Sequence, residues 1–228
     1  MKVLELKNLV KIYNDSAIQV KAVDNINLSF EQGEFAAIVG PSGSGKTTLL
    51  NMIGGLDNPT EGEIVVNDQN IGKLSSSKLI DFRLHNIGFV FQAYNLIPVL
   101  TAKENVEFIM ELQGKKRIER DERAIELLSA VGLADRVNSR PAKLSGGQQQ
   151  RVAVARALAS KPKFVLADEP TANLDSKSTE TLLDIMEQLN REENITFIFS
   201  THDQRVVKKA RRVITVEDGH VTSDEKRA

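Results

Sequence analysis

A glycine-rich segment, GPSGSGKTT at residues 40–48, is the part of this sequence that points most directly to chemistry. Its three glycines let the backbone curl tightly, so that successive N–H groups can face one bound anion. Lys46 adds a mobile positive charge for outer phosphates, and the hydroxyl of Thr47 can ligate Mg²⁺. Because the segment follows an apolar strand and opens a helix, it has the context that a Walker A motif requires. It predicts a nucleoside triphosphate site formed by Gly40, Pro41, Ser42, Gly43, Ser44, Gly45, Lys46, Thr47 and Thr48.

Two adjacent acids end a second apolar run, FVLADE at residues 164–169. Asp168 falls at the end of this predicted strand, where it can hold Mg²⁺ through water. Glu169 follows and is placed to polarise a water that attacks the γ-phosphate. Such a pair on its own would more often cap a helix or lie in a solvated turn. Beside a Walker A segment, it favours hydrolysis of the terminal phosphate.

Three further side chains at strand ends are candidates for the same site. Gln92 ends IGFVFQ and His202 follows FIFST. Ligands of parallel sheets lie beyond the carboxyl ends of the strands, where Asp168 and Glu169 also fall. Tyr13 ends the first strand, and its ring could stack on a purine. Each of the three, taken singly, could equally be a structural residue.

A second candidate anion site lies in LSGGQQQR, residues 144–151. Ser145, Gly146 and Gly147 open a helix that is predicted to run to about Ser160, and the positive end of a helix attracts anions. No lysine and no acidic pair accompany it. The segment could therefore bind a phosphate but could not cleave one, and on its own it would be read as a serine-capped helix.

The hydrophobic pattern gives the elements that must position these residues. Apolar runs predict strands at 3–13, 22–30, 34–40, 62–68, 87–92, 164–169, 195–201 and 213–222. The last of them contains Asp-Gly before β-branched residues, which indicates a hairpin. Helical periodicity predominates from 94 to 160, beginning with the capping-box sequence TAKE, and the tail SDEKRA is expected to fray. This order indicates an α/β sheet domain interrupted by a helical insert.

Composition sets outer limits on the class of protein. The 228 residues suffice for one large domain with a full core. With 30 basic and 31 acidic side chains, no global field would recruit nucleic acid or anionic lipid. The absence of cysteine excludes disulfides and suits a reducing compartment. No eighteen apolar residues run together, so work at a membrane would require a partner.

The motifs taken together resemble those of the ATP-binding cassette (ABC) ATPases. GPSGSGKT, Gln92, LSGGQ, FVLADE, NLD at 173–175 and His202 occur in the order and at the spacing of that family, over nearly the whole chain. The resemblance implies an α/β fold: a P-loop NTPase core with a mixed, mainly parallel sheet, an N-terminal antiparallel β subdomain and an inserted α-helical subdomain. It implies one domain over 1–228, divided into a nucleotide-binding core with the β subdomain at 1–92 and 161–228 and a helical signature subdomain at 93–160.

The resemblance also implies how the two anion sites work together. In this family two copies enclose two ATP molecules, and the P-loop of one copy faces the signature helix of the other. Ser145 and Gly147 would then contact the γ-phosphate held by Lys46 of the partner subunit. The implied ATP-binding residues are those of the P-loop with Tyr13, Ser145, Gly146, Gly147, Gln148 and Asp175. The implied ligands of Mg²⁺ are Thr47, Gln92 and Asp168, and the implied catalytic residues are Glu169, His202, Gln92 and Lys46.

Within the family, FQAYNLIPVLTAKENVE, GGLDNPTEGEI and LSGGQQQRVAVARAL resemble the ATPases of lipoprotein-releasing (LolD-like) and macrolide-exporting (MacB-like) systems. Amino-acid uptake ATPases share much of this pattern and stay open as an alternative. The resemblance implies an ATP-hydrolysing subunit that pairs with a second copy of itself. It would drive an integral membrane permease from the cytoplasmic face of the inner or plasma membrane, without binding nucleic acid.

Three other classes fit the sequence less well. A small-molecule kinase with a P-loop would have no signature helix. A DNA-repair or chromosome ATPase of the same family would carry a long coiled coil between Gln92 and Leu144, where this chain has about fifty residues. The basic run KKARR at 208–212 is more often a solvated face than a nucleic-acid site. A translation factor would carry two cassettes in one chain.

Overall fold

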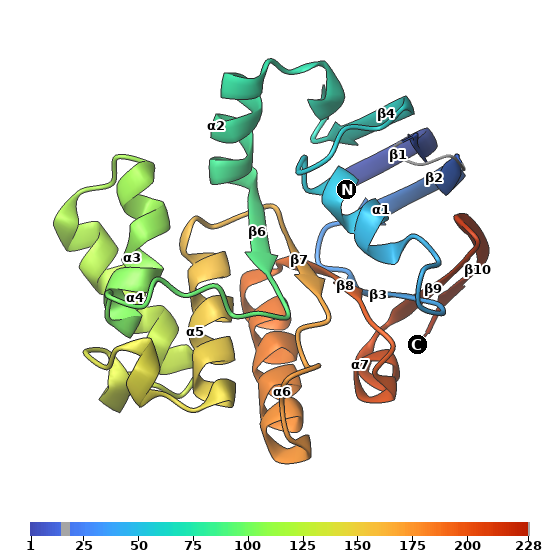
Figure 1. Ribbon diagram of the computed structural model, residues 1–228. Helices are drawn as coiled ribbons and strands as arrows, with labels where there is room; N and C mark the ends of the chain where they lie inside the picture. The colour runs from blue at the N-terminus through green and yellow to red at the C-terminus, as the bar shows by residue number, and fades with distance from the viewer. Residues whose placement is uncertain (15–18, 228) are drawn as a thin grey trace.

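The larger of the two β-sheets in the structure has six strands (Figure 1). The computed structural model describes residues 1–14 and 19–227. The strand order is β10-β9-β3-β8-β7-β6, and every neighbouring pair is parallel except β9 with β10. These strands are β3 (Phe35–Val39), β6 (Ile87–Val90), β7 (Phe164–Asp168), β8 (Thr196–Ser200), β9 (Arg212–Glu217) and β10 (His220–Lys226). The residues of β3, β7 and β8 are almost all buried, as expected in a parallel sheet covered on both faces.

A smaller antiparallel sheet has the order β2-β1-β4-β5. Its strands are β1 (Lys2–Tyr13), β2 (Val20–Glu31), β4 (Glu61–Val66) and β5 (Gln69–Asn70). Buried and exposed residues alternate along the second half of β2 and in β4, because only one face of this sheet packs on the core. The predicted mixed, mainly parallel sheet with an N-terminal antiparallel part is thus confirmed.

The helices lie on both sides of the larger sheet. They are α1 (Lys46–Ile53), α2 (Ser76–Asn86), α3 (Ala102–Leu112), α4 (Arg117–Ala130), α5 (Gly146–Ala159), α6 (Ser176–Glu193) and α7 (Gln204–Lys209), with short 3₁₀ turns η1 (Ile71–Lys73), η2 (Ala134–Arg136) and η3 (Pro141–Lys143). In Figure 1, α3 and α4 stand at the left, and α5 lies between them and α6.

Alternate residues of the same strands belong to two buried clusters, one on each face of the larger sheet. Phe35 and Ala37 of β3 pack with α5 and α6. Ala36 and Ile38, the residues between and after them, pack with α1 and with the smaller sheet. Helix α1 therefore lies between the two sheets, as Figure 1 shows. The cluster that contains Phe35 also contains buried residues of α3 and α4. The boundaries of the 93–160 subdomain stay a prediction.

Local signals in the sequence account well for the ends of elements. The Thr101 side chain accepts a hydrogen bond from the N–H of Glu104, whose carboxylate accepts one from the N–H of Thr101, so the capping box is confirmed. The Asp-Gly hairpin joins β9 to β10. The prediction that the tail frays is wrong for residues 223–226, because β10 continues to Lys226, which pairs with Arg212. Ala228 lies outside the described residues. Arg212 also holds Asp224 through two hydrogen bonds of 2.8 and 2.7 Å.

Candidate active site

The loop between β3 and α1 is the predicted phosphate cradle. Gly40, Gly43 and Gly45 have φ angles of 152°, 81° and 99°. A Cβ on Gly40 would lie 2.0 Å from the carbonyl oxygen of Val216, and one on Gly45 would lie 2.1 Å from that of Ala22, so no other residue fits there. Gly45 caps α1 without a side-chain hydrogen bond. The first N–H groups of α1 are therefore left for an anion.

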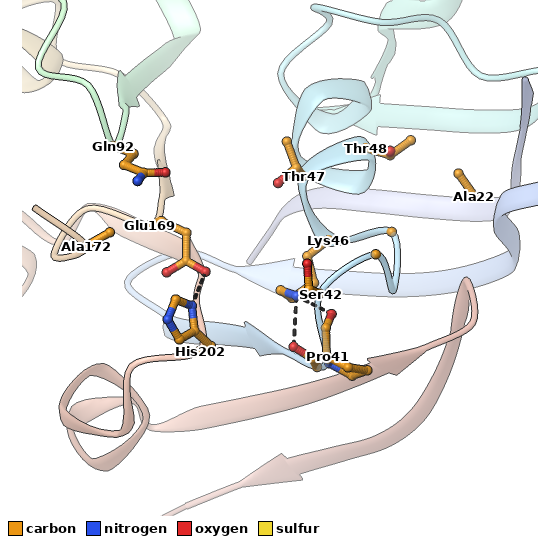
Figure 2. A pocket seen from close by; sticks show the side chains of 13 residues that line it. Ala22, Pro41, Ser42, Lys46, Thr47, Thr48, Gln92, Glu169, Ala172 and His202 are labelled. Carbon is orange, nitrogen blue, oxygen red and sulfur yellow. Dashed lines mark hydrogen bonds and ion pairs between the residues drawn. The ribbon is translucent and has the colours of Figure 1, made fainter. Parts of the chain in front are cut away.

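The ammonium group of Lys46 lies within this loop. Its Nζ donates hydrogen bonds of 2.8 Å to the carbonyl oxygens of Gly40 and Pro41 (Figure 2). The residue is 9% exposed. The ammonium group therefore has only neutral carbonyl oxygens as hydrogen-bond acceptors here. Phosphate oxygens could replace them, because charged acceptors form stronger hydrogen bonds.

A cavity of about 580 Å³ opens beside the loop and gathers residues that are far apart in the sequence. It is lined by the loop, by Thr47 and Thr48 of α1, and by Gln92, Glu169 and His202. Figure 2 shows Glu169 and His202 on one side and Lys46 on the other. The topological argument that placed these side chains beyond the carboxyl ends of parallel strands agrees with this arrangement.

Asp168 lies at the end of β7, next to the first turn of α1. Its Oδ1 accepts a hydrogen bond of 3.3 Å from the hydroxyl of Thr47. Burial raises the pKa of Asp168, although the nearby hydroxyl groups of Ser200 and Thr47 act in the opposite direction. A cation beside this carboxylate would favour its ionised form. Among residues 1–14 and 19–227, no three His, Cys, Asp or Glu side chains cluster to hold a metal, and Mg²⁺ needs only one or two protein ligands beside phosphates and water. The oxygen groups present therefore fit Mg²⁺.

Glu169 is held in an unusual backbone conformation. Its φ is 45°, in the left-handed region that non-glycine residues adopt at a cost of about 1–3 kcal/mol. Its N–H donates to the carbonyl oxygen of Ser200 at 2.8 Å. Its carboxylate accepts a hydrogen bond of 3.1 Å from the hydroxyl of Thr201 and lies 2.7 Å from Nδ1 of His202. The sequence did not reveal these contacts of Ser200 and Thr201, which end the strand neighbouring the acidic pair.

Gln150, in α5, is a further buried residue of the site that the sequence did not single out. Its side chain is fully buried, and its Nε2 donates to the carbonyl oxygens of Pro170 at 2.8 Å and Phe91 at 3.2 Å. These carbonyl groups adjoin Glu169 and Gln92, so one amide group holds both segments. No local pattern signals this contact, since both partners are main-chain atoms.

The loop after β6 is held at other carbonyl groups as well. Arg156 donates to the carbonyl oxygens of Tyr94 and Asn95 at 3.0 and 2.5 Å. The side-chain amide of Asn173 donates a hydrogen bond of 3.1 Å to the carbonyl oxygen of Gln92. Helix α5 and the segment after β7 thus fix the backbone around Gln92.

The signature segment lies outside this cavity. Ser145 accepts from the N–H of Gln148 at 3.3 Å, and the Gln148 side chain accepts from the N–H of Ser145 at 2.9 Å, which completes a capping box. Neither these residues nor Gly146 and Gly147 line the cavity. Asp175 caps α6, and hydrogen bonds from the hydroxyl and N–H of Ser178 lower the pKa of its carboxyl.

Tyr13 also lies outside the lining of the cavity, at the end of β1. Its hydroxyl donates a hydrogen bond of 2.7 Å to Asp57. It lies near the side chain of Thr48, which does line the cavity. The tyrosine is therefore at the margin of the phosphate site.

Known proteins match this chain closely. The model of the family described as ABC transporter matches residues 23–172, so the chain belongs to the ABC transporter family. It is 49% identical over 223 residues to YvrO of Bacillus subtilis (strain 168), described as an uncharacterized ABC transporter ATP-binding protein, and the match covers 98% of this chain and 97% of that one. It is 47% identical over 221 residues to the macrolide export ATP-binding/permease protein MacB of Hyphomonas neptunium, covering 97% of this chain and 34% of that protein.

A solved structure matches over the whole length. The dimeric structure of a post-hydrolysis state of the ATP-binding cassette MJ0796, bound to ADP and Pi, superposes with a TM-score of 0.90 at 44% identity and covers 99% of both chains. The chain is thus the ATP-binding component of an ABC transporter and an ATPase. No helix in the described part of the chain has the length and apolar character to cross a bilayer.

Proposed function

We propose that two copies of this chain close around two ATP molecules and that each site is completed by both copies. The observation that supports this most directly is the separation of the two anion-binding segments. The P-loop cavity holds Lys46, Gln92 and Glu169 of one chain, whereas Ser145 and the first N–H groups of α5 lie outside it. A phosphate on Lys46 would be left uncovered on one side, and α5 of a partner subunit offers the missing donors.

The proposed catalytic roles follow from these positions. Glu169 accepts the proton of the attacking water, and His202 keeps the carboxylate oriented and approaches the γ-phosphate. Lys46 and the loop N–H groups bind the β- and γ-phosphates. Thr47, Gln92 and Asp168 would hold Mg²⁺, which neutralises charge on the phosphates when it is bound. Tyr13 stacks on the adenine, and Asp175 contacts the partner subunit at the interface.

We further propose an integral membrane permease as partner, of the lipoprotein-release or macrolide-export type, which would hold the chain at the cytoplasmic face of the inner or plasma membrane. The similarity to a protein described as ATP-binding/permease supports this. The exposed Val99, 69% accessible in the loop that follows Gln92, offers an apolar contact for it. Val99→Asp is expected to reduce co-purification of the permease from solubilised membranes and to leave hydrolysis by the isolated chain unchanged. Undiminished co-purification would argue against this contact.

Mixing of two inactive variants tests the shared site. Lys46→Ala removes the phosphate-binding charge, and Ser145→Asp places a carboxylate where the partner's γ-phosphate would lie. A mixed dimer of these two variants has one intact site, so mixing should restore activity that neither variant has alone. Mixing Lys46→Ala with Glu169→Gln is the control, because both residues line the cavity of the same chain and no intact site can form. Equal results from the two mixtures would refute the proposal.

A further inference from the structure

Three side chains form a closed group at the end of β1. The hydroxyl of Tyr13 donates to Oδ2 of Asp57 at 2.7 Å. The ammonium of Lys11 donates to Oδ1 of the same carboxylate at 2.6 Å and lies 4.9 Å from the centre of the Tyr13 ring, over its face. Lys11 and Tyr13 point to the same side of β1 because they are two residues apart. Each member of the group therefore contacts both of the others.

The side chains of this group are partly shielded from water. The side chains of Lys11 and Asp57 are only 13% and 29% exposed. Burial acts to raise the pKa of Asp57, but the hydrogen bonds from Lys11 and Tyr13 outweigh it and lower the pKa. Burial, followed by the hydrogen bond to Asp57, raises the pKa of Tyr13. The tyrosine is thus a neutral donor to a charged acceptor, and such bonds are stronger than those between neutral groups.

The arrangement limits where a ligand can bind on the ring. An exposed tyrosine usually turns about its side-chain bonds, but here the hydroxyl is held by Asp57 and one face is covered by Lys11. A flat ligand is therefore excluded from the face that Lys11 covers. Aromatic stacking on a purine needs a fixed ring plane, and this group provides it.

Helix α1 links this group to the phosphate cradle. Thr48, in its first turn, lines the cavity and lies near the hydroxyl of Tyr13. Asp57 follows the other end of the helix, where its N–H donates to the carbonyl oxygen of Asn51. The eight residues of α1 span about 12 Å. The same rigid element therefore sets the position of the ring and of the phosphate-binding N–H groups.

We infer that Asp57 and Lys11 are positioning residues that hold Tyr13 as a one-sided stacking surface for the adenine of ATP. The inference rests on the proposed adenine contact of Tyr13 and extends it. Neither residue touches the nucleotide. They hold the tyrosine ring in place before the nucleotide binds, so that less conformational entropy of this side chain is lost on binding.

The test compares ATP with inorganic triphosphate, which has the phosphates but no base. Asp57→Ala and Lys11→Met are expected to weaken ATP binding by the full chain roughly three- to tenfold, which is part of the loss of about five- to 150-fold that removing the stack on one base would cause. Binding of Mg²⁺-triphosphate should stay within about twofold, because the cradle is unchanged. The KM for ATP should rise while kcat is retained. Tyr13→Phe, which keeps the ring and removes only the donor, should give a smaller change in the same direction.

A matched control uses another ion pair next to the same small sheet. Lys73 and Glu63 lie 2.7 Å apart, and their side chains are 74% and 42% exposed. Neither residue lines the cavity, so Lys73→Met should change neither affinity. Asp57→Ala in a Tyr13→Ala background should add nothing to the loss of ATP affinity, because the two residues act through one contact.

The outcomes separate the inference from the proposed function. Equal weakening of ATP and triphosphate would overturn the inference, because Asp57 would then support only the folding of α1. Full ATP affinity in Asp57→Ala, with a loss in Tyr13→Ala, would also overturn it while leaving the adenine contact intact. Unchanged ATP affinity in Tyr13→Ala would overturn both. Selective loss of ATP affinity in Asp57→Ala, Lys11→Met and Tyr13→Ala would support both.

Discussion

The Nδ1 atom of His202 lies 2.7 Å from Oε1 of Glu169, and this contact orients the acid before any nucleotide binds. The other oxygen of Glu169 accepts a hydrogen bond from Thr201. Thr201 and His202 follow β8 directly, and Glu169 follows β7 directly. The parallel pairing of β7 with β8 therefore positions the proposed base and the group that holds it.

Glu169→Gln should abolish turnover, with a loss of at least about 100-fold, because an amide cannot accept the proton of water. ATP binding should persist, and the variant should elute from a size-exclusion column as an ATP-dependent dimer. Phosphate release and elution volume, each measured with and without ATP, check this. Normal hydrolysis by the variant would exclude Glu169 as the base.

Ser145→Ala and Ser145→Asp separate capping of α5 from phosphate binding. Alanine should lower the free energy of unfolding by about 1 kcal/mol, whereas aspartate caps as well as serine and should leave it unchanged. Hydrolysis should fall in both variants, and nucleotide binding by the monomer should be retained. Urea unfolding, ATPase assays and nucleotide titration of dilute protein provide the measurements. Loss of binding by the monomer would indicate that Ser145 acts within its own chain.

Gln150→Leu should reduce kcat more than it changes the KM for ATP, since the carbonyl groups beside Gln92 and Glu169 lose their common donor. Leaving these buried acceptors without a partner should also lower the free energy of unfolding by about 1–3 kcal/mol. Gln149→Leu is the matched control, because that amide bonds only to the nearby carbonyl oxygen of Leu144. If both variants retained the same kcat, Gln150 would have only a structural role.

The free energy of unfolding should decrease at acid pH as Asp224 becomes protonated. The hydrogen bonds from Arg212 hold the pKa of Asp224 below its ordinary value of 3.8. Because the folded pKa is lowered, the ionised pair stabilises the fold fully above that value, and this contribution is lost as the pH falls through the lower, folded pKa. Asp224→Asn should cost about 1 kcal/mol at pH 7, a figure reduced by solvent screening. Urea unfolding between pH 7 and 3 should then show a shallower acid loss in the variant than in the parent, and parallel profiles would contradict this.

Activity per chain should increase with protein concentration, because a monomer lacks half of each proposed site. ATP hydrolysis measured over a dilution series should fall toward zero per molecule at low concentration. Addition of the Lys46→Ala variant to dilute parent protein should raise the rate, since it supplies Ser145 for the parent's P-loop. A constant specific activity at every dilution would contradict the shared site.

The parts of the site that the sequence predicted are those with a local physical signal. The P-loop needs glycines, a lysine and a hydroxyl within nine residues, and the acids follow directly on a buried strand. The convergence of Gln92 and His202 followed from a rule about parallel strands that needs no knowledge of side-chain contacts. The order of strands and helices was likewise readable from hydrophobic periodicity.

The contacts that the sequence did not predict join distant segments through main-chain atoms. Gln150 reaches carbonyl groups 59 and 20 residues away, and a glutamine in a helix carries no mark of such partners. Asp57 was part of a motif but had no role until the structure placed Tyr13 beside it. The tail was expected to fray because it is polar, but pairing with β9 decided its conformation.

Strand β10, which joins β9 by the hairpin, also determines how the molecule meets its neighbours in solution. The residues of β9 are mostly buried, and they would present unpaired N–H and C=O groups if β10 were absent. Strand β10, which pairs with the outer side of β9, ends in Asp224, Glu225 and Lys226. Charged side chains on an edge strand discourage the addition of further strands from other molecules. The charged side chains of β10 are therefore expected to disfavour edge-to-edge association of this sheet.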